Sequence, residues 1–222
     1  MTAVMVFKDY PECRECPFGE ICVHPGLASR VYGEVNPEHD TCVFFVGQAP
    51  GVREDAEGKV WIGESGKRLA TLVKGSNLGD HVAVVMGNAF RCLPPPGKTG
   101  FNTNVKKCFP HIVEDLEVIA GLYGRVIVVA LGAPAAYAFT RGSLGNALGG
   151  QGQVLNSLPG SPVLFASYHP AILLPGRKPQ LIHAMSLHFT LLFKFIMTGE
   201  IPHLVDDLEP IVGGDPPDEL RS

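Results

Sequence analysis

The sequence predicts a three-layer α/β/α domain around a central four-stranded parallel sheet. Four short apolar runs, at residues 41–46, 82–86, 125–131 and 163–167, have the composition of strands buried on both faces. Segments with helical periodicity alternate with these runs, as in a parallel sheet covered by helices. The chain has 222 residues, 45% of them hydrophobic, which suits one sizeable core better than two. We therefore assign residues 1–199 to a single domain.

The segment that precedes the first strand is expected to be irregular. Residues 1–41 contain Pro17, Gly19, Pro25 and Gly26 in short order and show weak periodicity. Contacts other than regular secondary structure must therefore hold this segment. After the first strand, a sharp loop at residues 47–51 leads to a predicted helix at residues 65–73, ahead of the second strand.

The later elements follow the same alternation. An amphipathic helix is predicted at about residues 103–122, with Pro110 near its first turn. A helix opens at Gly132 after the third strand, residues 143–162 are Gly-rich and poorly ordered by pattern, and a long helix covers residues 179–197. Residues 200–222 are expected to form an acidic, loosely ordered tail.

Charge and hydropathy exclude several classes of protein. The whole chain carries a net charge of −4, but the tail holds seven acids and one base, so the rest carries +2, which permits a DNA partner without demanding one. The longest uncharged apolar run, residues 126–139, is interrupted by Gly132 and Pro134, whereas a membrane span needs roughly 20 residues. The N-terminus has no basic-then-apolar leader. We expect a cytoplasmic, monomeric protein without a membrane partner.

Polar segments follow three of the four predicted strands. They occupy residues 47–51, 87–92 and 168–171. The carboxyl ends of parallel strands lie at one edge of a sheet, where ligands of such folds bind. This convergence is the strongest physical indication of an active cleft.

Cysteine usage indicates a metal or cluster site. Cys13 and Cys16 form a Cys-x-x-Cys pair, and Cys92 and Cys108 are separated by 15 residues. Disulfides are not expected without a secretion signal, so a structural zinc site and an iron–sulfur cluster are both open. Cys42 lies inside the first strand as a small core residue, and Cys22 is either an incidental thiol or a ligand.

The ordered motifs resemble one family. They are Cys13-x-x-Cys16, Gly47-Gln48-Ala49-Pro50-Gly51, residues 58–63 with Ser65-Gly66, Gly87-Asn88-Ala89-Phe90-Arg91-Cys92, Cys108, and Tyr168-His169-Pro170-Ala171. Across residues 13–196 the chain resembles the iron–sulfur (family 4) uracil-DNA glycosylases. The resemblance implies that Cys13, Cys16, Cys92 and Cys108 hold a [4Fe-4S] cluster with a structural role.

The chain departs from the family at several positions. Gln48 stands where the family usually has Glu, and Trp61 where it has Phe. Gln cannot act as a general base, so activation of water by a carboxylate at that position is in doubt. Relatives that trap DNA covalently carry a His before the last cysteine, and residues 93–107 contain none. We therefore expect no covalent trapping.

The implied activity is uracil-DNA glycosylase chemistry: hydrolysis of the N-glycosidic bond in base excision repair, which leaves an abasic site. An extruded uracil departs as an anion, so donors aimed at its carbonyls are needed. His169 suits O2, and Asn88 matches O4 and N3–H. Trp61 offers a stacking surface. Gln48 could hold the attacking water or contact the base, and Asp55 could support the water or the cationic sugar. Ala49 and Gly51 are expected to contact the base.

Three basic residues are candidate DNA contacts, and two other functions are compatible with the sequence. Arg91, Lys98 and Arg177 are candidate contacts for the backbone of uracil-containing DNA and of the abasic product. One alternative is a non-catalytic binder of such DNA, because Gln48 replaces the usual Glu. The other is a zinc-stabilised nucleotide-binding or polymerase-associated module that keeps only the fold.

Overall fold

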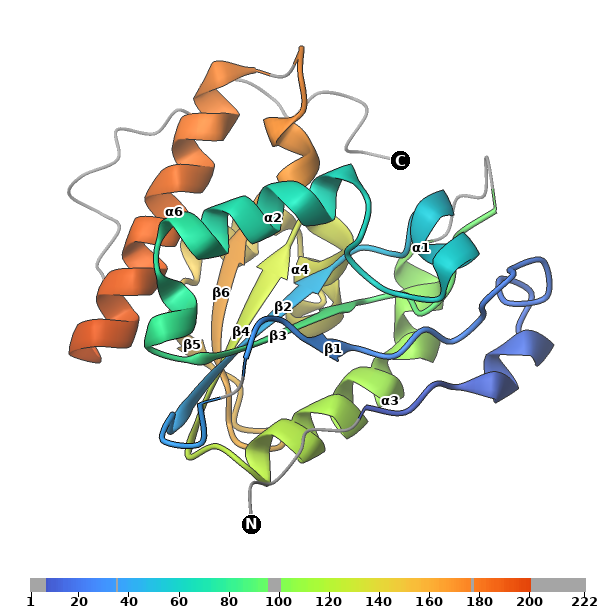
Figure 1. Cartoon of the computed structure of the whole chain (residues 1–222), viewed down its shortest axis with the longest axis horizontal. Coiled ribbons are helices and arrows are strands. Elements are labelled where there is room, and N and C mark those ends of the chain that lie inside the picture. The colour runs from blue at the N-terminus through green and yellow to red at the C-terminus, as the bar shows by residue number, and fades with distance from the viewer. Residues whose placement is uncertain (1–6, 35, 96–100, 177, 201–222) are drawn as a thin grey trace.

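A computed structural model describes residues 7–34, 36–95, 101–176 and 178–200, apart from the side chains of residues 101–104. It contains one six-stranded sheet in the order β1-β3-β2-β4-β6-β5 (Figure 1). The strands are β1 Arg30–Val31, β2 Thr41–Gly47, β3 Ala83–Asn88, β4 Arg125–Leu131, β5 Gln153–Val154 and β6 Val163–Ser167.

The four predicted strands form the parallel centre of this sheet. β2 pairs in parallel with both β3 and β4, and β4 pairs in parallel with β6. Nearly every residue in these strands is buried, because helices cover both faces. The predicted fold class is confirmed. The sheet has six strands rather than four, since β1 and β5 add two-residue antiparallel edges.

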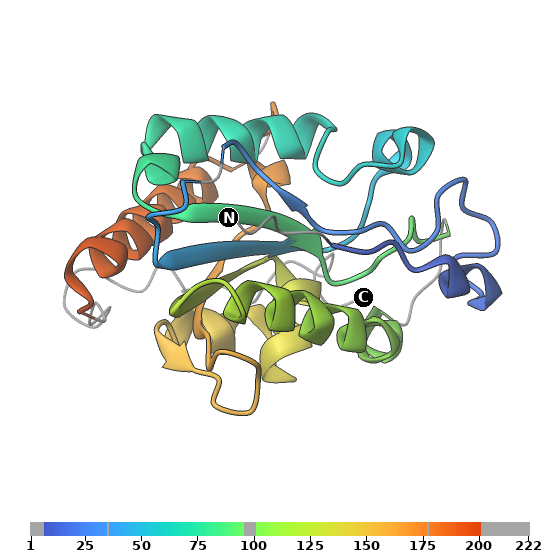
Figure 2. The same ribbon diagram turned by 60° about the horizontal axis from the view of Figure 1, so that its bottom comes forward.

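The helices form two layers. They are α1 Val52–Glu57, α2 Glu64–Gly75, α3 Phe101–Ala120, α4 Ala133–Thr140, α5 Leu144–Gly149 and α6 Pro179–Thr198, with short 3₁₀ turns η1 Pro11–Glu15, η2 Leu78–Asp80 and η3 Pro170–Leu173. Val43 and Phe45 of β2 pack with α2 and α6, whereas Phe44 packs with α3 and α4. Figure 2 shows these layers above and below the sheet.

Two expectations about order are corrected. Pro110 lies in the middle of α3 rather than in its first turn, because the helix begins at Phe101. Residues 143–162 contain α5 and β5, and Ser143 caps α5 by accepting a hydrogen bond from the Asn146 N–H. The serine cap and the pairing of a short strand give regular structure to a segment whose composition had predicted little of it. The predicted tail lies outside the described residues from position 201 onward.

Helix α6 bears on the expectation that no membrane span exists. Among the described residues, it is the one helix long and apolar enough to cross a bilayer by length and composition, with a mean hydropathy of 1.4. Such a helix is weak evidence for a membrane segment, since a core helix passes the same test. Four of its side chains are buried in the sheet-facing core: Met185, Phe189, Leu192 and Phe195.

Candidate functional site

A pocket of about 340 Å³ opens where β2, β3 and β6 end. Its lining includes Ala49, Gly51, Glu54, Trp61, Asn88 and His169. Gly47 and Asn88 are register partners at the ends of β2 and β3, so the sheet itself brings two of the polar segments together. The predicted convergence of strand ends is confirmed, and the volume lies within the usual range for small-molecule sites.

Trp61 is packed into the base of this pocket by two close backbone approaches. A Cβ on Gly47 would lie 2.3 Å from the indole Cζ2, and a Cβ on Gly66 would lie 2.2 Å from the Trp61 carbonyl oxygen. The indole Nε1–H donates to the carbonyl of Gly87 at 2.8 Å. Trp61 also adopts a φ of 59°, a left-handed conformation that bulky residues rarely take. Its orientation is therefore strongly determined.

The protonation of His169 follows from its surroundings. The Ala171 N–H donates to His169 Nδ1 at 3.2 Å, so in the neutral ring the proton resides on Nε2. Burial lowers the pKa of His169 from its ordinary value of 6.5 to about 4, against the opposing effect of the Glu54 charge. At neutral pH the side chain is thus an uncharged imidazole with one N–H available to donate.

Glu54 is a pocket residue that the sequence analysis did not single out. Its Oε1 accepts from the N–H groups of Ile62 at 3.1 Å and Gly63 at 2.8 Å, and its Oε2 accepts from Gly51 at 3.2 Å. One carboxylate therefore joins the loop after β2 to the loop before α2. The sequence could have indicated this contact, because a Glu at the third position of a helix commonly accepts from the N–H of the N-cap residue, here Gly51.

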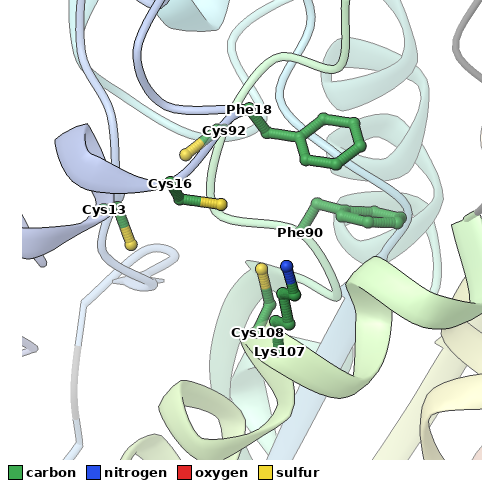
Figure 3. Close-up of a pocket in the computed structure, with 7 residues that line it drawn as sticks. All are labelled: Cys13, Cys16, Phe18, Phe90, Cys92, Lys107 and Cys108. Carbon is green, nitrogen blue, oxygen red and sulfur yellow. The ribbon is translucent and has the colours of Figure 1, made fainter.

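A second, smaller pocket gathers the four predicted ligand cysteines. Cys13, Cys16, Cys92 and Cys108 line it together with Phe18, Phe90 and Lys107 (Figure 3). The Gly26 N–H donates to Cys92 Sγ at 3.3 Å. The sulfurs come from the N-terminal segment, the loop after β3, and α3, so the pocket joins three distant parts of the chain.

The other two cysteines have different surroundings. The Cys22 thiol donates to the carbonyls of Phe18 at 3.1 Å and Leu93 at 3.3 Å, and burial raises its pKa to about 11. Cys42 is fully buried in β2 and belongs to the core. Cys22 is not among the residues that line the cysteine pocket, which favours the incidental thiol over the ligand.

Residues 32–186 match the family model described as "Uracil DNA glycosylase superfamily". The chain belongs to this superfamily. It is 29% identical over 177 residues to a "Type-4 uracil-DNA glycosylase" of Thermotoga maritima, covering 80% of this chain and 85% of that protein. It is 30% identical over 174 residues to the protein of the same name from Pyrobaculum aerophilum, covering 76% of this chain and 82% of the relative.

Not every predicted site residue of this superfamily member lies in the pocket. The Asp55 carboxylate accepts from the N–H groups of Val23 at 3.1 Å and His24 at 3.0 Å, outside the pocket lining. It ties α1 to the N-terminal segment, which corrects the expectation that it supports water. Gln48 also lies outside the lining, and its carbonyl accepts from the Phe90 N–H at 2.8 Å.

One of the three expected DNA contacts, Arg91, is wrong. Arg91 is fully buried and forms an ion pair with Asp115, so its guanidinium cannot reach a phosphate. It also donates to Ser29 Oγ at 2.8 Å. A buried arginine needs such partners, and here they are supplied by the protein interior. The other two candidates, Lys98 and Arg177, lie outside the described residues.

Proposed function

We propose that the chain is a monofunctional uracil-DNA glycosylase, which hydrolyses the N-glycosidic bond of uracil in DNA and leaves an abasic site. The observation that carries the proposal is the placement of Asn88 and the neutral His169 in one pocket at the strand ends. Membership of the superfamily and the printed names of the relatives support it. The partners would be uracil-containing DNA and its abasic product.

Asn88 would select the base. Its side chain carries both a donor and an acceptor, which complement O4 and N3–H of uracil. Cytosine presents the reverse pattern at these positions, so one amide orientation rejects it. Asn88 is 3% exposed at the end of β3, so a mismatched base would leave buried polar groups unpaired.

His169 would stabilise the departing base. As the glycosidic bond breaks, negative charge grows on uracil, and the Nε2–H is free to donate to O2. A buried donor that needs no reorganisation is worth more than one in water. The Ala171 N–H holds the tautomer that this role requires. The protein thus supplies a neutral donor rather than a full positive charge.

Glu54 would act on the sugar side of the reaction. Its charge lies in the pocket, where a cationic sugar develops when the base leaves, and three N–H donors hold it in place. Because bond breaking largely precedes attack by water in this kind of mechanism, a fixed negative charge helps without a general base at Gln48. Glu54 thereby takes the part for which the sequence had suggested Asp55.

The cysteine pocket fits a [4Fe-4S] cluster. Four thiol groups surround one small space beside the rings of Phe18 and Phe90, and cluster ligation requires four thiolates. Four cysteines are also the ligand set of a structural zinc site, so analysis of iron and acid-labile sulfide distinguishes the two. Bound there, a cluster would clamp three segments together.

Uracil release from a single-uracil oligonucleotide tests the activity. We expect release by the wild-type protein, and strong losses in Asn88→Ala and His169→Ala. His183→Ala serves as a control, because His183 is exposed on α6 away from the pocket lining. Binding in a gel-shift assay without release, at enzyme excess, would instead support the non-catalytic alternative. Undiminished release by both pocket variants would refute the assigned roles.

A further inference from the structure

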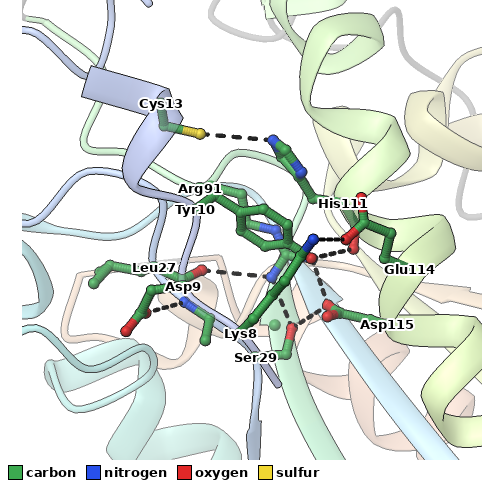
Figure 4. A network of polar contacts seen from close by, with 12 residues as sticks. Lys8, Asp9, Tyr10, Cys13, Leu27, Ser29, Arg91, His111, Glu114 and Asp115 are labelled. Carbon is green, nitrogen blue, oxygen red and sulfur yellow. Dashed lines mark hydrogen bonds and ion pairs between the residues drawn. The ribbon is translucent and has the colours of Figure 1, made fainter. Parts of the chain in front are cut away.

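A histidine outside the base pocket contacts one of the four cysteines. Cys13 Sγ lies 3.6 Å from His111 Nε2, within hydrogen-bonding distance for sulfur (Figure 4). His111 lies on α3, three residues after Cys108. The contact therefore joins two of the segments that line the cysteine pocket, and nothing in the proposed glycosylase chemistry uses it.

The direction of this hydrogen bond follows from the chemistry of the two groups. A cysteine that binds iron is a thiolate and can only accept. His111 Nδ1 is buried and has no hydrogen-bond partner among the described residues. A proton on Nδ1 would leave a buried donor unpaired and place the Nε2 lone pair against the thiolate. The proton therefore belongs on Nε2, which donates to Cys13.

Contacts hold both the imidazole and the backbone of His111. The ring lies against Tyr10 with 3.7 Å between centroids and 35° between the ring planes, and the Tyr10 hydroxyl donates to the His111 carbonyl at 3.3 Å. Arg91 Nη2 donates to the same carbonyl at 3.0 Å and pairs with Asp115. These contacts lie close to every ligand segment, since Tyr10 precedes Cys13 by three residues and Arg91 adjoins Cys92.

We propose that His111 is a positioning residue of the cysteine pocket, which donates its Nε2–H to the Cys13 thiolate and thereby tunes and retains the bound cluster. The inference rests on the proposed [4Fe-4S] cluster. Hydrogen bonds to ligand sulfur stabilise the more negative, reduced form of a cluster and so raise its reduction potential. The same bond orients Cys13 and opposes its exchange for solvent.

Two substitutions of the full-length protein separate the hydrogen bond from packing. His111→Phe keeps a flat ring against Tyr10 but removes the donor. His111→Gln loses the ring but restores an amide N–H near the position of Nε2. His183→Phe is the matched control on the exposed side of α6. For each protein we would measure iron and sulfide per chain, the midpoint potential, and the rate of cluster loss to a chelator in air.

We expect His111→Phe to shift the midpoint potential to more negative values and to lose its cluster several-fold faster than the wild type. His111→Gln should recover part of both changes, and His183→Phe should match the wild type. A potential and loss rate unchanged in His111→Phe would overturn the inference while leaving the cluster in place. A wild-type protein without iron and sulfide would overturn the cluster proposal and this inference together, whatever its glycosylase activity.

Discussion

The imidazole of His169 lies 5.6 Å from the ring of Trp61, with 22° between their planes. A base stacked face to face needs roughly 3.5 Å on each side, so a base between these two rings would require about 7 Å between the ring planes. Uracil therefore cannot be sandwiched between them as they stand. It would meet His169 by its edge, which is the approach that a hydrogen bond from Nε2–H to a carbonyl requires.

Replacing His169 should reduce the rate of bond cleavage more than binding. His169→Phe keeps a ring beside Trp61 but removes the donor, and loss of one such donor costs about 10²–10³-fold in kcat. We expect a fall of that order in single-turnover uracil release, with a KM within a few-fold of the wild type. A large rise in KM with unchanged kcat would place His169 in ground-state binding only.

Glu54 and Asp55 form a natural matched pair for mutagenesis. Both are buried carboxylates that accept backbone N–H groups, but only Glu54 lies in the pocket. Glu54→Gln should lower kcat by at least about tenfold, whereas Asp55→Asn should cost about 1–3 kcal/mol of stability and leave kcat of the folded protein nearly unchanged. Urea unfolding and single-turnover assays measure both quantities. Equal kinetic losses in the two variants would contradict the assignment.

Arg91 should prove to be a stability residue. Arg91→Met leaves the Asp115 carboxylate buried without its partner, which costs about 3–5 kcal/mol in comparable buried pairs. Adding Asp115→Leu should recover much of the loss, because an apolar pair replaces an uncompensated charge. Denaturant midpoints of the single and double variants test this. A destabilisation below 1 kcal/mol, together with a weaker salt dependence of DNA binding, would restore a phosphate-binding role.

Two half-buried histidines should make the fold sensitive to acid. Burial lowers the pKa values of His169 and His188 to about 4, whereas both are near 6.5 when unfolded. Between these values the unfolded chain takes up protons that the folded chain does not, so stability is complete above pH 6.5 and falls toward pH 4. Each residue contributes up to about 3 kcal/mol of this loss.

His188→Asn isolates one of these contributions. The asparagine amide lies near the position of His188 Nδ1, which is 3.1 Å from Ser167 Oγ, so it can keep this hydrogen bond, but it does not titrate. We expect the variant to lose less stability than the wild type between pH 6.5 and pH 4, measured as urea midpoints across that interval. Parallel pH profiles for the two proteins would show that His188 does not bind protons in this way.

The sequence was most informative about the strands at the centre of the sheet. β4 and β6 match their predicted bounds, because a short apolar run without helical period is typical of a strand buried on both faces. β1 and β5 have only two residues each, and their pairing depends on partners that no local pattern reveals. Short edge pairing of this kind is a tertiary property.

Sequence reasoning also predicted only part of the site, because some of its contacts depend on residues distant in the chain. Asn88 and His169 line one pocket, as expected from strands whose carboxyl ends converge, whereas Trp61 was named from the family motif and lies between α1 and α2. Arg91 was misassigned because its buried partner, Asp115, lies 24 residues away on α3. Glu54 and Asp55 are adjacent in the chain, but the turn of α1 directs one carboxylate into the pocket and the other to the N-terminal segment.

Uracil release from a single-uracil oligonucleotide, compared with matched thymine and cytosine oligonucleotides, tests the central claim most directly. We expect free uracil and an alkali-labile abasic site from the wild-type chain, no product from the thymine or cytosine strands, and loss of product in Asn88→Ala. No uracil release at enzyme excess, from a folded chain that binds the oligonucleotide, would contradict it.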